Sequence, residues 1–309
     1  MSVGSLVGLA GLVGDFEAVL AEDPIDLARA ALLIARIEYP TLDPAPSLEV
    51  LDRLGERAAV RLATSVSTRD RVAILNSFLF VEERFSGNLE RYADFRNSLL
   101  NVVLGRRLGI PITLALVYME VARRAGLDVQ GVAFPGHFLL RVALGAPTPP
   151  ADPARPSRSL ARSLPALILD PFNGGAEMDA AACQRLLGTH LGQLGDELPF
   201  DRALLDPCAP RQMLSRMLNN LKRTYVEMRS FPQAKAATDL LLAIDPMLHV
   251  ERRDRGLLAY HLDDYTSALR DLEDYLRLHG WSSGKQEKGE HDQIWEHVKN
   301  LRRRVAGFN

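Results

Sequence analysis

A histidine and an aspartate are the residues of this chain whose types and positions could support catalysis. His137 follows Pro135 and Gly136, and Asp170 opens the run DPFNGG at 170–175. A carboxylate that holds an imidazole in one tautomer is the orienting half of a catalytic triad, in which a nucleophile beside the ring gives up its proton. A His–Asp pair can also be purely structural. The pair therefore indicates chemistry only if a nucleophile lies next to it.

The segments around these two residues predict the elements that position them. Residues 127–134, 138–144 and 166–169 are short apolar runs, which predicts three strands. Residues 111–124 are apolar almost all round and begin with proline, which suits the first turn of a buried helix. The expected fold is α+β, with a central buried helix against a small antiparallel sheet. Adjacent strands would bring His137 and Asp170 together, and glycine at 136 permits the close approach of a backbone or ligand.

Two polar residues interrupt the apolar helix. Thr113 and Glu120 are seven positions apart and so lie on one face. A carboxylate on such a helix either faces a cleft or is paired with a cation, and the candidates for pairing are Arg96, Arg106 and Arg107. Thr113 is a candidate nucleophile in form, although a threonine in the first turn of a buried helix more often bonds the backbone.

Amides are the other candidates for a cleft. Asn97 and Asn101 lie one turn apart in a short helix predicted over 94–104, where they could clamp the backbone of a loop or simply be exposed. Asn173 follows Asp170 in the DPFNGG run. With Glu120 and Gly136, these amides are the predicted binding residues of the cleft.

The rest of the chain is mainly helical by its apolar period. Residues 5–70 predict about three amphipathic helices with proline-marked joints, and further helices are expected over 71–85 and 178–194. Residues 147–165 are rich in Pro, Ser, Ala and Arg without an apolar period, which predicts a surface insertion between two strands. Residues 199–210 are predicted to be a linker.

A repeat follows the linker. The words FPQA at 231–234 and YTSA at 265–268 are 34 positions apart, and each lies between two amphipathic segments. A period of 34 with a helix-turn-helix in each unit is the tetratricopeptide pattern. Residues 280–289 are polar and are predicted to be a flexible tail segment, and 292–305 could form a last helix. Two such units are expected to pack on other parts of the chain or on a partner.

Composition excludes several classes of function. With 47% hydrophobic and 25% charged residues, the 309-residue chain is of ordinary globular type, and its net charge of -2 gives no global attraction for nucleic acid or an anionic membrane. Cys183 and Cys208 are too few for a disulfide framework and fit no zinc spacing. Residues 1–13 have neither a secretory signal of the usual form nor the about 20 apolar residues of a membrane span. We expect a cytoplasmic protein without cofactor or metal; a metal site built from His137, Asp170 and Glu120 is the weak alternative.

Several short sequence motifs, in the same order along the chain, resemble the Sir-B-type family of transglutaminase-like proteins. Members of that family typically carry tetratricopeptide repeats after the transglutaminase-like domain. The resemblance covers about residues 71–280. The motifs that carry it are NS at 97–98, RLGIPI at 107–112, YME at 118–120, ARR at 122–124, Gly126, PGHFL at 135–139 and the DPFNGG run.

The resemblance implies a papain-like fold whose triad is a Cys at the start of the buried helix, followed by His and Asp on successive strands. His137 and Asp170 match the second and third members. Pro111 stands where the Cys is expected, with Ile112 and Thr113 as gapped alternatives, so the thiol is missing. Cys183 and Cys208 come after Asp170 and are expected to be packing thiols.

These observations predict three parts: an N-terminal helical segment at 1–70, a transglutaminase-like domain at 71–200 and a tetratricopeptide-like domain at 201–309. The expected function is a non-catalytic pseudoenzyme that binds a protein or peptide in a retained cleft. The alternative is a hydrolase or amide-group transferase that uses Thr113, or a water activated by His137 and Asp170.

Overall fold

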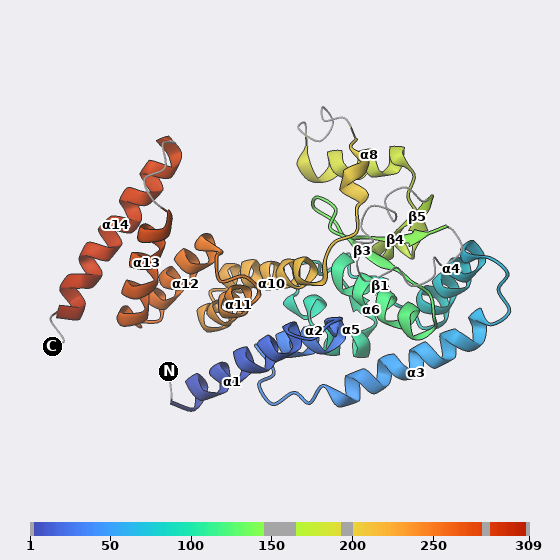
Figure 1. Ribbon diagram of the computed structural model, residues 1–309, viewed down its shortest axis with the longest axis horizontal. Helices are drawn as coiled ribbons and strands as arrows, with labels where there is room; N and C mark the ends of the chain where they lie inside the picture. The colour runs from blue at the N-terminus through green and yellow to red at the C-terminus, as the bar shows by residue number, and fades with distance from the viewer. Residues whose placement is uncertain (1–2, 145–164, 193–199, 280–284, 307–309) are drawn as a thin grey trace. The chain divides into compact units, whose positions relative to one another are not determined.

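The computed structural model describes residues 3–144, 165–192, 200–279 and 285–306 (Figure 1). The chain divides into two compact units. The helical unit comprises Met1–Asp26, Leu33–Thr41 and Leu218–Asn309, and the mixed unit comprises Leu27–Leu32 and Leu42–Met217. His137 and Asp170 both belong to the mixed unit.

The sheet of the mixed unit is antiparallel, as predicted, and its strands follow one another in chain order. Strands β3 (Gln130–Val132), β4 (Leu139–Ala143), β5 (Ala166–Asp170) and β6 (Ala176–Glu177) are ordered β3-β4-β5-β6. In the register, Val132 pairs with Leu139 and Leu140 pairs with Leu169. The sequence did not reveal β6, because its two residues, Ala176 and Glu177, are exposed and carry no apolar signal.

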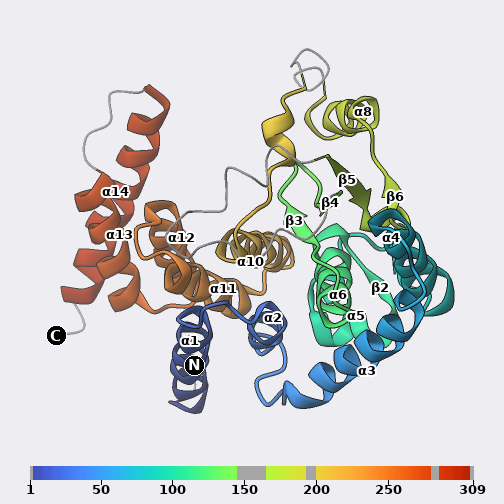
Figure 2. The same cartoon turned by 45° about the vertical axis from the view of Figure 1, so that its right-hand side comes forward.

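The helix α6 (Pro111–Arg124) has the bounds predicted for the central helix, and its side chains are almost all buried. It packs against β3 and β4. On the other face of the sheet, Cys183 and Leu187 of α8 (Ala180–Leu191) join Val132, Leu139 and Ile168 in one apolar cluster. The sheet therefore lies between α6 and α8 (Figure 2), which confirms the α+β class.

Helices α3 (Ala45–Leu62), α4 (Thr68–Asn76) and α5 (Leu100–Arg106) complete the mixed unit around α6, with which α3 and α5 are in contact. The helix predicted over 71–85 continues beyond α4 as a π-helical turn, η1 (Ser77–Glu82). A two-stranded parallel pair, β1 (Ser86–Gly87) with β2 (Leu108–Gly109), leads directly into α6. The structure also contains three short 3₁₀ turns. The first, η2 (Phe95–Ser98), lies in the predicted 94–104 helix, η3 (Pro171–Asn173) follows β5, and η4 (Arg202–Leu205) lies in the predicted linker.

The helical unit contains the predicted repeat. Phe231 and Tyr265 are the first residues of α11 (Phe231–Ile244) and α13 (Tyr265–His279), and each is followed by a partner helix, α12 (His249–His261) or α14 (Lys285–Ala306). Ala234 and Ala268, three positions into their helices, are fully buried. Arg255 of α12 joins the stack by pairing with Asp271 of α13 at 2.6 Å and with Asp239 of α11 at 3.1 Å.

Helix α1 (Val3–Leu20) contacts α11 in the helical unit, whereas α2 (Leu27–Ala35) and α10 (Pro210–Glu227) contribute residues to both units. The prediction of a flexible segment over 280–289 is wrong for its second half, which is the start of α14. Most of the insertion predicted at 147–165 lies outside the described residues. Among the helices of the described ranges, none is long and apolar enough to cross a membrane.

Candidate functional site

The structure places His137 and Asp170 in direct contact. His137 lies just before β4 and Asp170 ends β5, the neighbouring antiparallel strand. The imidazole Nε2 is 2.9 Å from Asp170 Oδ1, and the two side chains are only 6% and 2% exposed. Because Asp170 engages Nε2, Nδ1 is the ring nitrogen that remains for a reactant.

Asp170 is held as an anion by three donors. Besides the imidazole, the backbone N–H of Phe172 donates to Oδ1 at 3.0 Å and the amide of Asn173 donates to Oδ2 at 2.8 Å. Burial alone would raise the pKa of Asp170, but the hydrogen bonds and the nearby imidazole outweigh it, so the pKa is lowered from its ordinary value. The site therefore has an orienting carboxylate, and Asn173 is part of it.

Two rings contact the imidazole of His137, and a third ring extends from one of them to the surface. Phe172 meets His137 edge-on at 6.1 Å between ring centroids, and Tyr92, which is 46% exposed, meets Phe172 edge-on at 5.8 Å. From α8, His190 stacks on His137 at 5.7 Å. Burial first, and then the proximity of His137 and Arg216, lower the pKa of His190. Sequence reasoning missed His190 and Tyr92, because each is brought to the site by tertiary packing without a recognisable motif.

Two glycines leave the space that lets the rings of His190 and Phe172 pack against the backbone. A Cβ at Gly136 would be 2.4 Å from His190, and Gly136 also has a positive φ of 69°. A Cβ at Gly87 would be 2.5 Å from the ring of Phe172. Gly87 pairs with Gly109, two residues before α6, so Phe172 links the start of the buried helix to His137. Gly136 was predicted to permit the close approach of a backbone or ligand; in the structure the group that approaches it is the side chain of His190.

The hydroxyl of Thr113 does not reach the histidine. It donates to the carbonyl of Asn97 at 2.7 Å and accepts the N–H of Ile110 at 3.1 Å, and the side chain is fully buried. Within the described residues it makes no hydrogen bond to His137. Both hydrogen-bonding functions of the hydroxyl are therefore used by the backbone at the start of α6.

Asn97 clamps a loop, which is one of the two predicted alternatives. Its Nδ2 donates to the carbonyls of Arg91 and Tyr92 at 2.7 and 3.3 Å, and its Oδ1 accepts from Asn88 at 3.0 Å. Asn97 is completely buried, so the exposed alternative was wrong. Asn101 takes no part in this clamp, since its Oδ1 is buried and has no hydrogen-bond partner in the described part of the chain.

Glu120 is paired with arginines of its own helix. Its Oε2 accepts from Arg123 at 3.0 Å and from Arg124, and Arg124 is paired in turn with Asp52 of α3 at 2.7 Å. The expected partners, Arg96, Arg106 and Arg107, were wrong, because a carboxylate reaches arginines three and four positions later on the same helix face. These ion pairs join α6 to α3 and leave Glu120 outside the His137 hydrogen-bond network.

Both thiols lie outside that network. Cys183 is fully buried in the cluster between α8 and the sheet, and Cys208 packs against Gly131. Burial raises the pKa of each thiol to about 11. A nucleophilic cysteine has its pKa lowered instead, so both thiols have the character of packing residues. No group of three His, Cys, Asp or Glu side chains within the described ranges is arranged to hold a metal ion.

Comparison with family models gives two adjoining matches. Residues 46–219, more than half of the chain, match the transglutaminase-like superfamily, and residues 221–303 match the tetratricopeptide repeat. The first match contains the whole His137–Asp170 site. The second contains α11 to α13 and most of α14.

Relatives match over most of the chain. A UPF0162 protein from Xylella fastidiosa is 38% identical over 269 residues, covering 85% of this chain and 87% of that protein. Protein SirB1 of Salmonella typhimurium is 24% identical over 77% of this chain and 79% of its own length. Human F-box only protein 21 is 30% identical over 56% of this chain but only 25% of its own length. The chain thus belongs to the transglutaminase-like superfamily, within the SirB-type group that carries a tetratricopeptide C-terminal region.

Proposed function

We propose that this protein is a non-catalytic member of its family that binds a protein or peptide segment at the His137–Asp170 site. The observation that carries the proposal is the state of Thr113, the one hydroxyl at the expected place of the nucleophile. It is buried and bonded to Asn97 and Ile110. Among the residues that the structure describes, no thiol or hydroxyl is hydrogen-bonded to His137, so none of them is placed for the imidazole to deprotonate.

The aromatic rings at the His137–Asp170 site support a role in binding. Tyr92 and Leu89 are exposed large side chains, 46% and 78% accessible, on the loop that Asn97 clamps. Because Asn97 fixes this loop, Tyr92 is presented on an ordered backbone, which lowers the entropy cost of binding. Exposed tyrosines on ordered surfaces are frequent energetic centres of interfaces. The tetratricopeptide helices are a second interaction surface, since such repeats generally mediate protein contacts.

The alternative function is a hydrolase or amide-group transferase in which His137 activates a water molecule. The retained Asp170 supports it, because an orienting carboxylate makes the imidazole a better base. Papain-like chemistry also needs a covalent nucleophile, which neither Cys183 nor Cys208 supplies. We therefore place this alternative second.

A peptide array with two readouts separates the two functions. The array is probed for binding of the full-length protein, and the same peptides in solution are assayed by mass spectrometry for cleavage, deamidation and transfer to an added amine. We expect binding without turnover, and Tyr92→Ala should weaken binding about tenfold, the loss of about 1.4 kcal/mol. Tyr39→Ala, which changes another exposed tyrosine, is the matched control and should bind normally.

Two results would contradict the proposal. Turnover by the natural protein that disappears in His137→Gln would establish the enzymatic function. If Tyr92→Ala and His137→Gln both bind the peptide as strongly as the natural protein does, the peptide binds to another surface. The candidate site would then have no role in recognition.

A further inference from the structure

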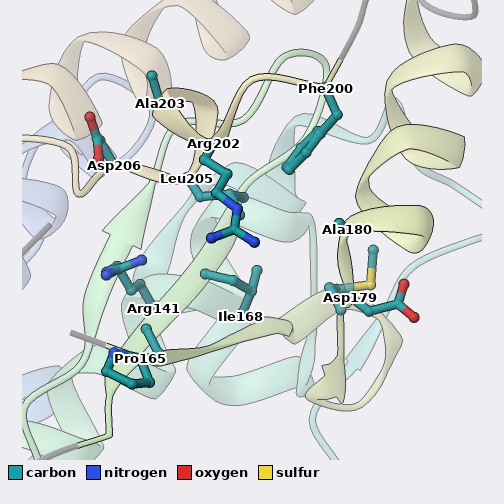
Figure 3. Close-up of a pocket in the computed structure, with 12 residues that line it drawn as sticks. Arg141, Pro165, Ile168, Asp179, Ala180, Phe200, Arg202, Ala203, Leu205 and Asp206 are labelled. Carbon is teal, nitrogen blue, oxygen red and sulfur yellow. The ribbon is translucent and has the colours of Figure 1, made fainter. Parts of the chain in front are cut away.

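A pocket in the mixed unit lies on the α8 side of the sheet (Figure 3). It encloses about 810 Å³. Its walls come from β4, β5, the start of α8 and η4, and neither His137 nor Asp170 lines it. Pockets that hold small ligands typically measure about 300–1,000 Å³, so this one has the size of a small-molecule site.

The floor of this pocket is apolar. Ile168, Met178, Phe200 and Leu205 line it, and all four belong to or pack against the cluster that joins α8 to the sheet. Ile168, on β5, is held there with only 6% exposure. A ligand that covers these side chains removes apolar surface from water, which favours binding.

Two arginines stand over that floor. Figure 3 shows the guanidinium of Arg202, from η4, pointing into the pocket, with the side chain of Arg141, from β4, beside it. Arg202 is exposed and forms no ion pair with any residue in the described ranges. Arg141 already has an interaction of its own, so Arg202 is the cation whose donors remain for a ligand.

The two aspartates that line the pocket do not neutralise Arg202. Asp179 is the N-cap of α8, where its Oδ1 accepts the N–H of Ala182 at 2.7 Å, and in Figure 3 its carboxylate points away from Arg202. Asp206 lies in a different part of the lining and also has an interaction of its own. The guanidinium thus points toward the apolar floor of the pocket and is not paired with either carboxylate.

We propose that this pocket binds a small amphipathic organic anion. The acidic group of the ligand accepts hydrogen bonds from Arg202, whose planar guanidinium suits an oxyanion, and the apolar group covers Ile168 and Phe200. This inference is independent of the peptide-binding role of the His137–Asp170 site, because the two sites share no residue.

The test uses two fluorescent probes of similar shape on the full-length protein. The first, 8-anilinonaphthalene-1-sulfonate, carries the rings and a sulfonate, whereas N-phenyl-1-naphthylamine carries the rings alone. We expect Arg202→Gln to weaken binding of the sulfonate probe on the order of tenfold, as for the loss of a charge-assisted hydrogen bond. Binding of the neutral probe should not change. Arg185→Gln, which removes the same charge from an exposed position of α8, should bind both probes as the natural protein does.

Three results of the probe titrations would overturn the proposal: no binding of the sulfonate probe, an equal loss in Arg185→Gln, or an equal loss of both probes in Arg202→Gln. The last would mean that Arg202 maintains the pocket without binding the anion. Displacement identifies the ligand class. Decanoate should displace the sulfonate probe, whereas displacement only by an acetylated acidic peptide would contradict a small-molecule ligand.

Discussion

Thr113 shows how one residue can decide what a retained His–Asp pair is able to do. Its hydroxyl hydrogen-bonds two buried backbone groups, the carbonyl of Asn97 in η2 and the N–H of Ile110 just before α6. Leaving such groups without partners is costly in a buried site. The hydroxyl therefore stabilises the junction between η2 and α6, and this structural role opposes any use as a nucleophile.

Replacement of Thr113 by valine tests this structural role. Valine has nearly the same shape but leaves both backbone groups unpaired, at a cost of about 1–3 kcal/mol for each buried group. We expect Thr113→Val to lower the free energy of unfolding of the mixed unit by about 2–6 kcal/mol, measured by circular dichroism in urea. Thr64→Val removes an exposed hydroxyl that bonds the Arg61 carbonyl and should cost less than about 0.5 kcal/mol. If Thr113→Val is as stable as Thr64→Val, the hydroxyl is not required by the fold.

At the scale of elements, the site depends on how closely α8 approaches the loop before β4. The ring of His190, in the last turn of α8, stacks on His137, and Gly136 leaves the space for it. Without this approach the imidazole of His137 would lose the cover on one of its faces. The contact also ties α8 to the end of the sheet where Asp170 lies.

The variant Gly136→Ala should show how much this contact contributes to stability. An alanine at a positive φ costs about 1–2 kcal/mol, and its Cβ would also meet His190 at 2.4 Å. Gly174→Ala is the matched control, because Gly174 has a φ of 67° but open space around its Cβ position. In urea unfolding we expect Gly136→Ala to be less stable than Gly174→Ala by about 1–3 kcal/mol.

Addition of His190→Gly to both glycine variants should remove that difference, because Cβ and Cγ of His190, the atoms that a Cβ at Gly136 would meet at 2.4 Å, are then absent. A Gly136→Ala/His190→Gly protein that remains less stable than Gly174→Ala/His190→Gly by the same margin would contradict the packing role of His190. Equal stability of the two glycine variants would mean that α8 yields to the added methyl group without cost.

The elements themselves were largely predictable from the sequence. The bounds of α6 followed from an apolar run opened by Pro111, and β4 and β5 followed from their apolar residues, because a buried element requires that pattern. The contact between His137 and Asp170 followed from strand pairing. The rings that pack around His137 could not be predicted in this way, because His190 and Tyr92 come from segments remote in sequence. The ion-pair partners of Glu120 were also not predicted, since they are arginines of its own helix.

At the scale of the whole molecule, each of the two units has a core of its own. In the helical unit, Leu272 of α13 is fully buried in a cluster with side chains of α12 and α14. In the mixed unit, Leu116 of α6 is fully buried. Units with separate cores can unfold separately if few interactions couple them.

Hydrogen exchange can reveal whether these two units unfold independently. Leu272→Ala creates a cavity that should lower the stability of the helical unit by about 2–5 kcal/mol. We expect faster amide exchange, measured by mass spectrometry, in peptides from α12 and α13, with unchanged exchange in peptides from α6. Leu116→Ala is the reciprocal variant and should accelerate exchange in peptides from α6 and leave exchange in peptides from α12 and α13 unchanged. If either variant accelerates exchange equally in α6 and α13, the chain unfolds as one cooperative structure, and binding at one unit would be expected to stabilise the other.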